Sequence, residues 1–268
     1  MRLLFYFFGL VLAMYLCAML ALFLMQDCML LPSTPDAADP RTLPHAAEDI
    51  KQWKVHGEYE GYIVAPAQGR ARGTFILYHG NEESAETKLP LADVFVQNGY
   101  RVVIVEYPGH GNRPGSRTMK ATLTASREAL AGALAQWGAP IFLVGESLGA
   151  GMASQVTKGN ETAVAGVVLI TPWDSLADVA AEKYPFLPVR WLLHDPFDSV
   201  AALSSFRGPL VIVGAQQDTL IPVLHARRLA SEHAHSHFLL LPTADHDNWF
   251  TAMRGSDWRQ ILALLHAG

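Results

Sequence analysis

At 268 residues, the chain is long enough for one full-sized domain plus an appendage, and it needs no disulfide or metal to stabilise a core. A formal net charge of −5 and a pI near 6.1 give no basic surface, so no nucleic-acid partner is predicted. The two cysteines, Cys17 and Cys28, lie in or beside the hydrophobic N-terminus, which excludes a cysteine hydrolase.

The N-terminal residues 3–25 form an uncharged, strongly apolar stretch. About 20 such residues cross a bilayer as a helix, so we predict an uncleaved transmembrane signal-anchor. The alternative is a cleaved signal peptide. Its apolar region usually has about 7–15 residues, and a small-residue cleavage site follows it. The longer run here, which ends in Gln26 and Asp27, favours the anchor. The same two residues argue against a lipid-modified Cys28.

Charges on either side of this stretch predict its orientation. Arg2 precedes it, and Asp27, Asp36 and Asp39 follow it. The positive-inside tendency therefore places the N-terminus in the cytoplasm and the rest of the chain on the non-cytoplasmic side, in a periplasm or lumen. Residues 26–48, with four prolines among small and polar residues, are predicted to be an extended linker. The folded domain is predicted to cover residues 49–268.

Within that domain, short apolar runs alternate with helix-length segments. The runs are typical of strands buried on both faces of a parallel sheet, and they cover residues 73–78, 101–106, 141–145, 164–170, 209–214 and 237–241. The predicted helices cover residues 84–98, 118–137, 148–158, 223–233 and 248–266. Residues 53–56 and 59–65 are predicted to pair as antiparallel strands ahead of them. This order predicts an α/β fold with an open, mainly parallel sheet.

The strongest local motif is Gly145-Glu146-Ser147-Leu148-Gly149, directly after an apolar run and before a helix-compatible segment. A serine on a sharp strand-to-helix turn needs glycines beside it for close packing, and the helix N-terminus behind it offers free N–H groups. This context predicts that Ser147 is a nucleophile, although a glycine-rich structural turn gives the same pattern.

A serine hydroxyl needs a base and an orienting carboxylate, and both occur further along the chain. Asp218 follows one predicted strand and His246 follows the next. The order Ser, Asp, His is that of α/β-hydrolases. Asp174, after the preceding strand, is the rival acid. Asp245 and Asp247 flank His246 too closely to reach the ring nitrogen that faces away from the serine.

Attack on a carbonyl places negative charge on its oxygen, which two backbone donors should meet. The N–H groups of Leu148, after the nucleophile, and of Asn81, in the loop after residues 73–78, are the predicted donors. His79, in the same loop, is predicted to brace the loop by packing and hydrogen bonding rather than to take part in the reaction.

Together these motifs make the sequence similar to the α/β-hydrolase superfamily. The similarity extends from residue 53 to the C-terminus, and it is carried by residues 78–81, 106–111, 145–149, 171–175, 214–222 and 244–246. More narrowly, the chain resembles the membrane-anchored α/β-hydrolase-domain branch, whose members act on lipids and acylated proteins. The resemblance implies about eight strands and acyl-enzyme cleavage of esters or thioesters, as in carboxylesterases, lipases and thioesterases. Residues 171–206 would form a short lid, whose aromatic clusters either line an acyl pocket or pack on the core.

Two alternatives to a serine esterase remain open on the sequence. The same triad serves an amidase or peptidase, and a hydrolase fold can also act as a non-catalytic binding protein. No cofactor and no metal is predicted, because His233, His235 and His237 have no carboxylates spaced as ligands beside them. The expected partners are a small-molecule or lipid ester and the membrane.

Overall fold

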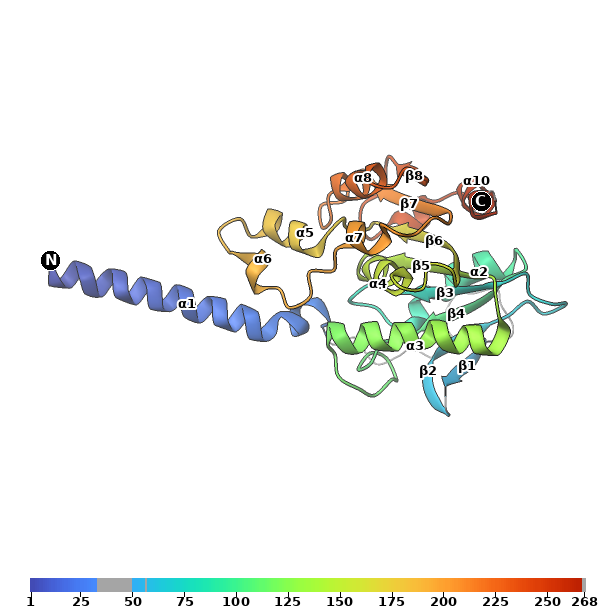
Figure 1. The fold of residues 1–268 in the computed structure, drawn as a ribbon, viewed down its shortest axis with the longest axis horizontal. Coiled ribbons are helices and arrows are strands. Elements are labelled where there is room, and N and C mark those ends of the chain that lie inside the picture. The colour runs from blue at the N-terminus through green and yellow to red at the C-terminus, as the bar shows by residue number, and fades with distance from the viewer. Residues whose placement is uncertain (33–49, 56, 267–268) are drawn as a thin grey trace.

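A computed structural model describes residues 1–32, 50–55 and 57–266 of this protein. Within them, eight strands form one sheet in the order β1-β2-β4-β3-β5-β6-β7-β8 (Figure 1). The strands are β1 (Ile50–Val55), β2 (Glu58–Val64), β3 (Thr74–Tyr78), β4 (Arg101–Val105), β5 (Ile141–Glu146), β6 (Val164–Ile170), β7 (Leu210–Ala215) and β8 (Ser236–Leu241). β2 pairs antiparallel with β1 and β4, whereas all pairs from β4 to β8 are parallel. The predicted α/β fold, with about eight mostly parallel strands, is confirmed.

Helices cover both faces of the sheet. The helices of the domain are η2 (Ala85–Lys88), α2 (Leu89–Val96), α3 (Met119–Trp137), α4 (Leu148–Thr157), α5 (Leu176–Lys183), α6 (Val189–Leu192), α7 (Ser199–Leu203), α8 (Val223–Ser231), α9 (Trp249–Ala252) and α10 (Gly255–Leu265). Buried side chains of α3, α4 and α8 form one apolar cluster with the sheet, and those of α2 and α10 form the other.

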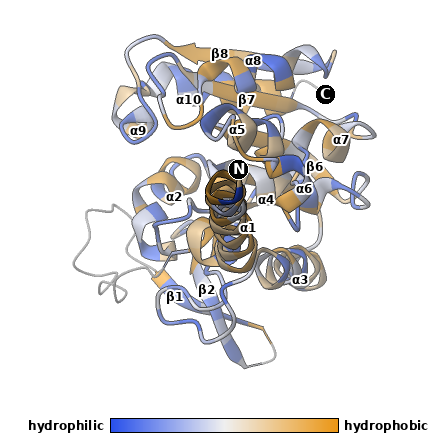
Figure 2. Cartoon of the chain, turned by 90° about the vertical axis from the view of Figure 1, so that its left-hand side faces the viewer, coloured by the Kyte–Doolittle hydropathy of each residue, from blue (hydrophilic) through white to orange (hydrophobic). Residues whose placement is uncertain are grey.

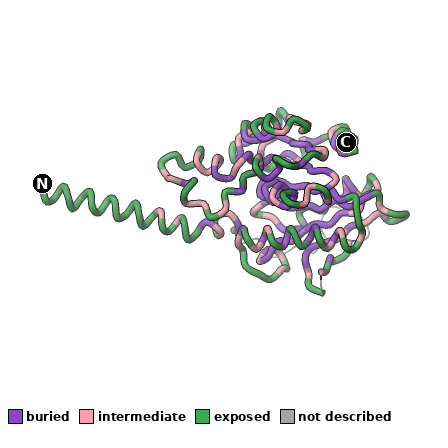
Figure 3. The backbone as a smooth tube through the Cα atoms, viewed as in Figure 1, coloured by how far each residue is buried: buried purple, intermediate pink, exposed green. Residues whose placement is uncertain are grey.

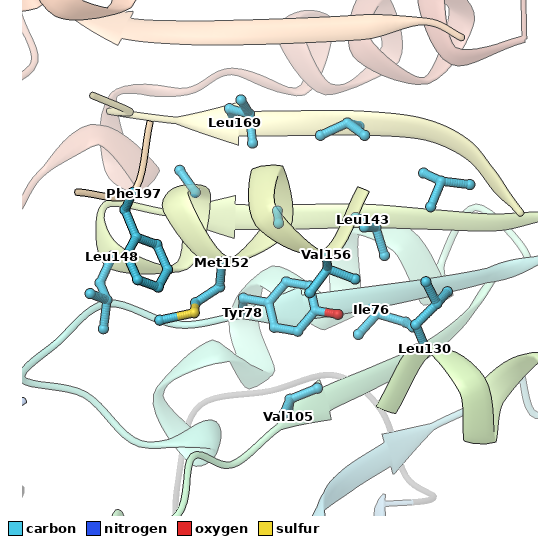
Figure 4. Packing of buried hydrophobic residues seen from close by; sticks show 14 of the residues in the cluster. Ile76, Tyr78, Val105, Leu130, Leu143, Leu148, Met152, Val156, Leu169 and Phe197 are labelled. Atoms are coloured by element: carbon cyan, nitrogen blue, oxygen red, sulfur yellow. The ribbon is translucent and has the colours of Figure 1, made fainter. Parts of the chain in front are cut away.

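The alternation of side chains along a strand supplies both clusters. In β3, where every residue is buried, Ile76 and Tyr78 join the cluster under α3 and α4, while Phe75 and Leu77 join the opposite one. Figure 4 shows Ile76 and Tyr78 among the residues of the first cluster. Strands buried on both faces therefore appear in the sequence as continuous apolar runs.

One predicted helix is interrupted in the structure. Residues 248–266 were expected to form a single helix, but α9 ends at Ala252 and α10 begins at Gly255. Arg254 is the N-cap of α10, and its backbone N–H donates a 2.8 Å hydrogen bond to the Asp257 carboxylate. This capping arrangement stabilises a new helix start.

The N-terminal helix α1 (Arg2–Leu30) projects from the domain (Figure 1). Its residues are mostly hydrophobic (Figure 2) and exposed (Figure 3), and the helix is long and apolar enough to cross a membrane. The helix continues through Gln26 to Leu30, where the sequence predicted the start of the linker, because Gln26 and Asp27 find hydrogen-bond partners on the domain. Residues 33–48 of the predicted linker lie outside the described residues.

The predicted lid, residues 171–206, contains α5, α6 and α7 between β6 and β7. In Figures 1 and 2, α5 and α6 lie beside α1, at the edge of the sheet where the parallel strands end. This edge also carries the candidate catalytic side chains.

Candidate active site

Ser147 lies on a strained turn between β5 and α4. Its backbone has φ 53° and ψ −117°, a conformation that residues other than glycine seldom adopt. A Cβ atom on Gly145 would lie 2.0 Å from the carbonyl oxygen of Gly149, and one on Gly149 would lie 2.0 Å from that of Tyr78. Both flanking glycines are therefore required, because the strand, the helix and the loop after β3 meet without room for a side chain.

The three residues predicted as a triad lie together at the carboxyl ends of β5, β7 and β8. The Ser147 Oγ is 2.9 Å from His246 Nε2, and His246 Nδ1 is 2.7 Å from Asp218 Oδ2. All three side chains are buried. The other oxygen of Asp218 accepts hydrogen bonds from the N–H groups of Leu220 at 2.9 Å and Ile221 at 2.8 Å. These bonds fix the carboxylate so that it faces the histidine.

The environment of His246 favours proton uptake. Burial lowers the pKa of His246, but the hydrogen bond and negative charge of Asp218 outweigh this effect and raise the pKa above its ordinary value. With Nδ1–H donating to the carboxylate, Nε2 is left to accept the proton of the Ser147 hydroxyl. This is the arrangement that a general base requires.

The rival acid, Asp174, contacts a different histidine. His225, on α8 and fully buried, has its Nδ1 2.7 Å from Asp174 Oδ1 and its Nε2 3.2 Å from Glu182 Oε2 on α5. Burial lowers the pKa of His225, but its hydrogen bond to Asp174 raises the pKa overall. This second Asp–His pair joins α8 to the predicted lid. Its histidine could not be recognised from the sequence, because His225 stands in an otherwise ordinary amphipathic helix.

The loop after β3, which holds the predicted oxyanion donor Asn81, is fixed against the turn at Ser147. His79 in this loop is fully buried, with Nε2 3.2 Å from Glu106 Oε1 and Nδ1 2.7 Å from the Gly80 carbonyl oxygen. The other predicted donor, Leu148, begins α4, where the first N–H groups have no partner within the helix.

A buried lysine connects this loop with the residue before the nucleophile. The Lys88 ammonium contacts the Glu146 carboxylate and donates to Glu83 Oε1 at 2.6 Å. The second oxygen of Glu83 accepts a hydrogen bond from the Gly80 N–H at 2.7 Å, and Glu146 accepts one from the indole N–H of Trp249 at 2.7 Å. Burial lowers the pKa of Lys88, but the two carboxylates raise it overall, so the lysine is charged at neutral pH. The spacing of apolar residues in the sequence does not predict this network.

Replacing Lys88 with methionine is expected to lower the free energy of unfolding by about 3–5 kcal/mol, because the buried Glu146 carboxylate and the partly buried Glu83 carboxylate would lose their cation. Urea unfolding in detergent, followed by tryptophan fluorescence, measures the change. The matched control is Lys54→Met, since Lys54 is exposed on β1 and its loss should change stability by less than about 0.5 kcal/mol. Equal effects of the two substitutions would contradict a stabilising role of Lys88.

Comparison with known proteins gives one family and several relatives. The family described as "Serine aminopeptidase, S33" matches residues 69–195. The uncharacterized protein Rv2307c of Mycobacterium tuberculosis is 29% identical over 192 residues, which cover 70% of this chain and 68% of that protein.

Solved structures share the fold at low sequence identity. The esterase Pf2001 of Pyrococcus furiosus matches with a TM-score of 0.67 and 15% identity, covering 88% of this chain and 97% of that one. Est1E of Butyrivibrio proteoclasticus, solved with ferulic acid bound, matches with a TM-score of 0.66 and 14% identity, covering 80% and 99%. The sheet, the matched family and these relatives identify the chain as a member of the α/β-hydrolase superfamily.

Proposed function

We propose that this protein is a serine hydrolase that cleaves carboxylic ester or thioester bonds of lipid or other acyl substrates. The observation that carries the proposal is the unbroken chain of hydrogen bonds from Ser147 Oγ through the His246 ring to Asp218. These groups come from three different strand ends, and structural roles alone do not require them to meet in this order.

The reaction uses each group in turn. Ser147 Oγ forms a bond to the acyl carbon while His246 Nε2 takes the hydroxyl proton. The N–H groups of Leu148 and Asn81 stabilise the resulting oxyanion. When the intermediate collapses, the leaving alcohol or thiol receives the proton from His246. Water then attacks the acyl-enzyme, with His246 again as base, and releases the carboxylic acid and the free serine.

The same proposal includes attachment to a membrane. Helix α1 would remain as an uncleaved anchor, with the hydrolase domain on the non-cytoplasmic side. The length and apolar surface of α1 support the anchor, and Arg2 at its start with Asp27 in its last turn supports the orientation.

A second candidate function is an aminopeptidase. It is favoured by the description of the family that matches residues 69–195. The triad chemistry would be the same, but the leaving group would be an amine and the substrate a peptide.

A fluorophosphonate probe on the detergent-solubilised full chain tests the proposal, because such probes form an adduct with an activated serine. We expect mass spectrometry to find the adduct on Ser147, and p-nitrophenyl esters to be hydrolysed with a preference for longer acyl chains. Faster cleavage of aminoacyl p-nitroanilides than of esters would instead favour the aminopeptidase. Folded protein without an adduct and without turnover would refute both enzyme functions and favour a non-catalytic binding protein.

A further inference from the structure

The end of α1 is bound to the domain at two places. Gln26 Nε2 donates to the Leu192 carbonyl oxygen at 3.1 Å, and Gln26 Oε1 accepts a hydrogen bond from the His194 N–H at 2.8 Å. On the other side, Asp27 Oδ1 accepts a hydrogen bond from the Met119 N–H, at the start of α3, at 3.0 Å. The end of α1 is therefore bound directly to the lid and to α3.

The lid also follows α1 toward its middle. The Tyr15 hydroxyl donates to the Phe186 carbonyl oxygen at 3.2 Å. Tyr15 and Gln26 are 11 residues apart, so at a rise of roughly 1.5 Å per residue the lid accompanies about 16 Å of the helix. If α1 spans a bilayer whose apolar core is about 30 Å thick, the lid tip lies within the nearer leaflet.

The lid segment from residue 184 to residue 193 is suited to such a position. Phe186 and Trp191 are each 89% exposed, and the segment's one charged residue, Arg190, is paired with Asp178. Six N–H groups donate to carbonyl groups within the segment or α5, namely those of Tyr184, Leu187, Val189, Trp191, Leu192 and Leu193, and residues 185 and 188 are prolines. Backbone in contact with lipid must satisfy its polar groups internally, as most of this segment does.

Between α1 and the lid lies an apolar cavity of about 140 Å³. Leu22 and Leu30 of α1 line it, together with Leu176 and Ala180 of α5 and Leu187 of the lid segment. Gln26 also lines it, but both ends of its amide are bonded to the lid backbone.

We propose that this cavity is the site for the acyl chain of a membrane-lipid substrate, and that the chain enters it from the bilayer between α1 and the lid. The inference rests on the proposed function, because it names the substrate class and the path of the same active site. α1 would then be part of the substrate site as well as an anchor. Leu176, which lines the cavity, belongs to the same buried cluster as Leu148, the residue after Ser147.

The position of the lid is tested without any enzymatic activity. The full chain is reconstituted into phosphatidylcholine vesicles with or without brominated acyl chains, which quench tryptophan fluorescence on contact. We expect quenching in the wild type that Trp191→Phe largely abolishes and that the control Trp137→Phe, on α3, retains. Equal quenching in the wild type and Trp191→Phe would overturn the contact between the lid and lipid.

The acyl site is tested by filling the cavity with Ala180→Trp. In the same vesicles we expect kcat/KM for p-nitrophenyl palmitate to fall at least 10-fold and that for p-nitrophenyl butyrate to stay within twofold. Ala131→Trp, at an exposed position on α3, should change neither. Equal loss on both esters, or no loss on the palmitate, would overturn the acyl site. A wild type that cleaves neither ester would instead refute the proposed function, while the quenching result would still report on the lid.

Discussion

Ser147→Ala and His246→Ala should each lower kcat for ester hydrolysis by about 10⁶-fold, as the loss of the serine or the histidine does in a serine protease. The serine provides the bond-forming oxygen, and the histidine 2.9 Å from it is the one base in contact with that oxygen among the described residues. Removing either member of the pair leaves the other without a function. We therefore expect the double variant to be no slower than either single variant.

A serine on the same helix provides the control. Ser154 is buried on α4, and its hydroxyl donates to the Ala150 carbonyl oxygen at 2.8 Å, which is a purely structural bond. Ser154→Ala should keep kcat within twofold, and fluorophosphonate labelling should persist there while it disappears in Ser147→Ala. Circular dichroism and thermal unfolding should show all these variants folded. Full activity in Ser147→Ala would contradict the proposed mechanism.

Asp218→Asn should lower kcat by about 10⁴-fold, as the equivalent substitution does in the template serine protease. The amide would keep an oxygen for the Leu220 and Ile221 N–H groups, so the loop should hold its shape. However, it would remove the charge that raises the pKa of His246 and would allow the ring to adopt the wrong tautomer.

Asp174→Asn is the matched control, because Asp174 contacts a histidine at the same 2.7 Å distance in the neighbouring Asp–His pair. Among the described residues, the side-chain hydrogen bonds and ion pairs of that pair go to groups other than Ser147, so we expect kcat to fall less than 10-fold. If Asp174→Asn were the slower of the two variants, the roles assigned to Asp174 and Asp218 would have to be exchanged. Steady-state hydrolysis of p-nitrophenyl butyrate by the two purified variants decides between these outcomes.

Some features of the structure could not be predicted from the sequence. The apolar stretch predicted as the anchor ends at residue 25, whereas the helix continues to Leu30, and Gln26 and Asp27 in this extension bond to the lid and to α3. Likewise, Lys88 looks like a surface residue in the sequence and becomes a buried cation only because Glu83 and Glu146 approach it. Both outcomes depend on partners distant in sequence, which local patterns do not report.

Local sequence patterns were enough to predict the strands, the strand-to-helix turn at Ser147 and the position of Asp218 and His246 beyond strand ends, because apolar runs and glycine positions are local signals. Which acid faces which histidine depends on how the elements pack together. Asp174 and Asp218 follow adjacent strands, β6 and β7, and both have a histidine at 2.7 Å. The contacts of His246 join residues 28 and 99 positions apart, so they exist only once the order of strands in the sheet brings those ends together.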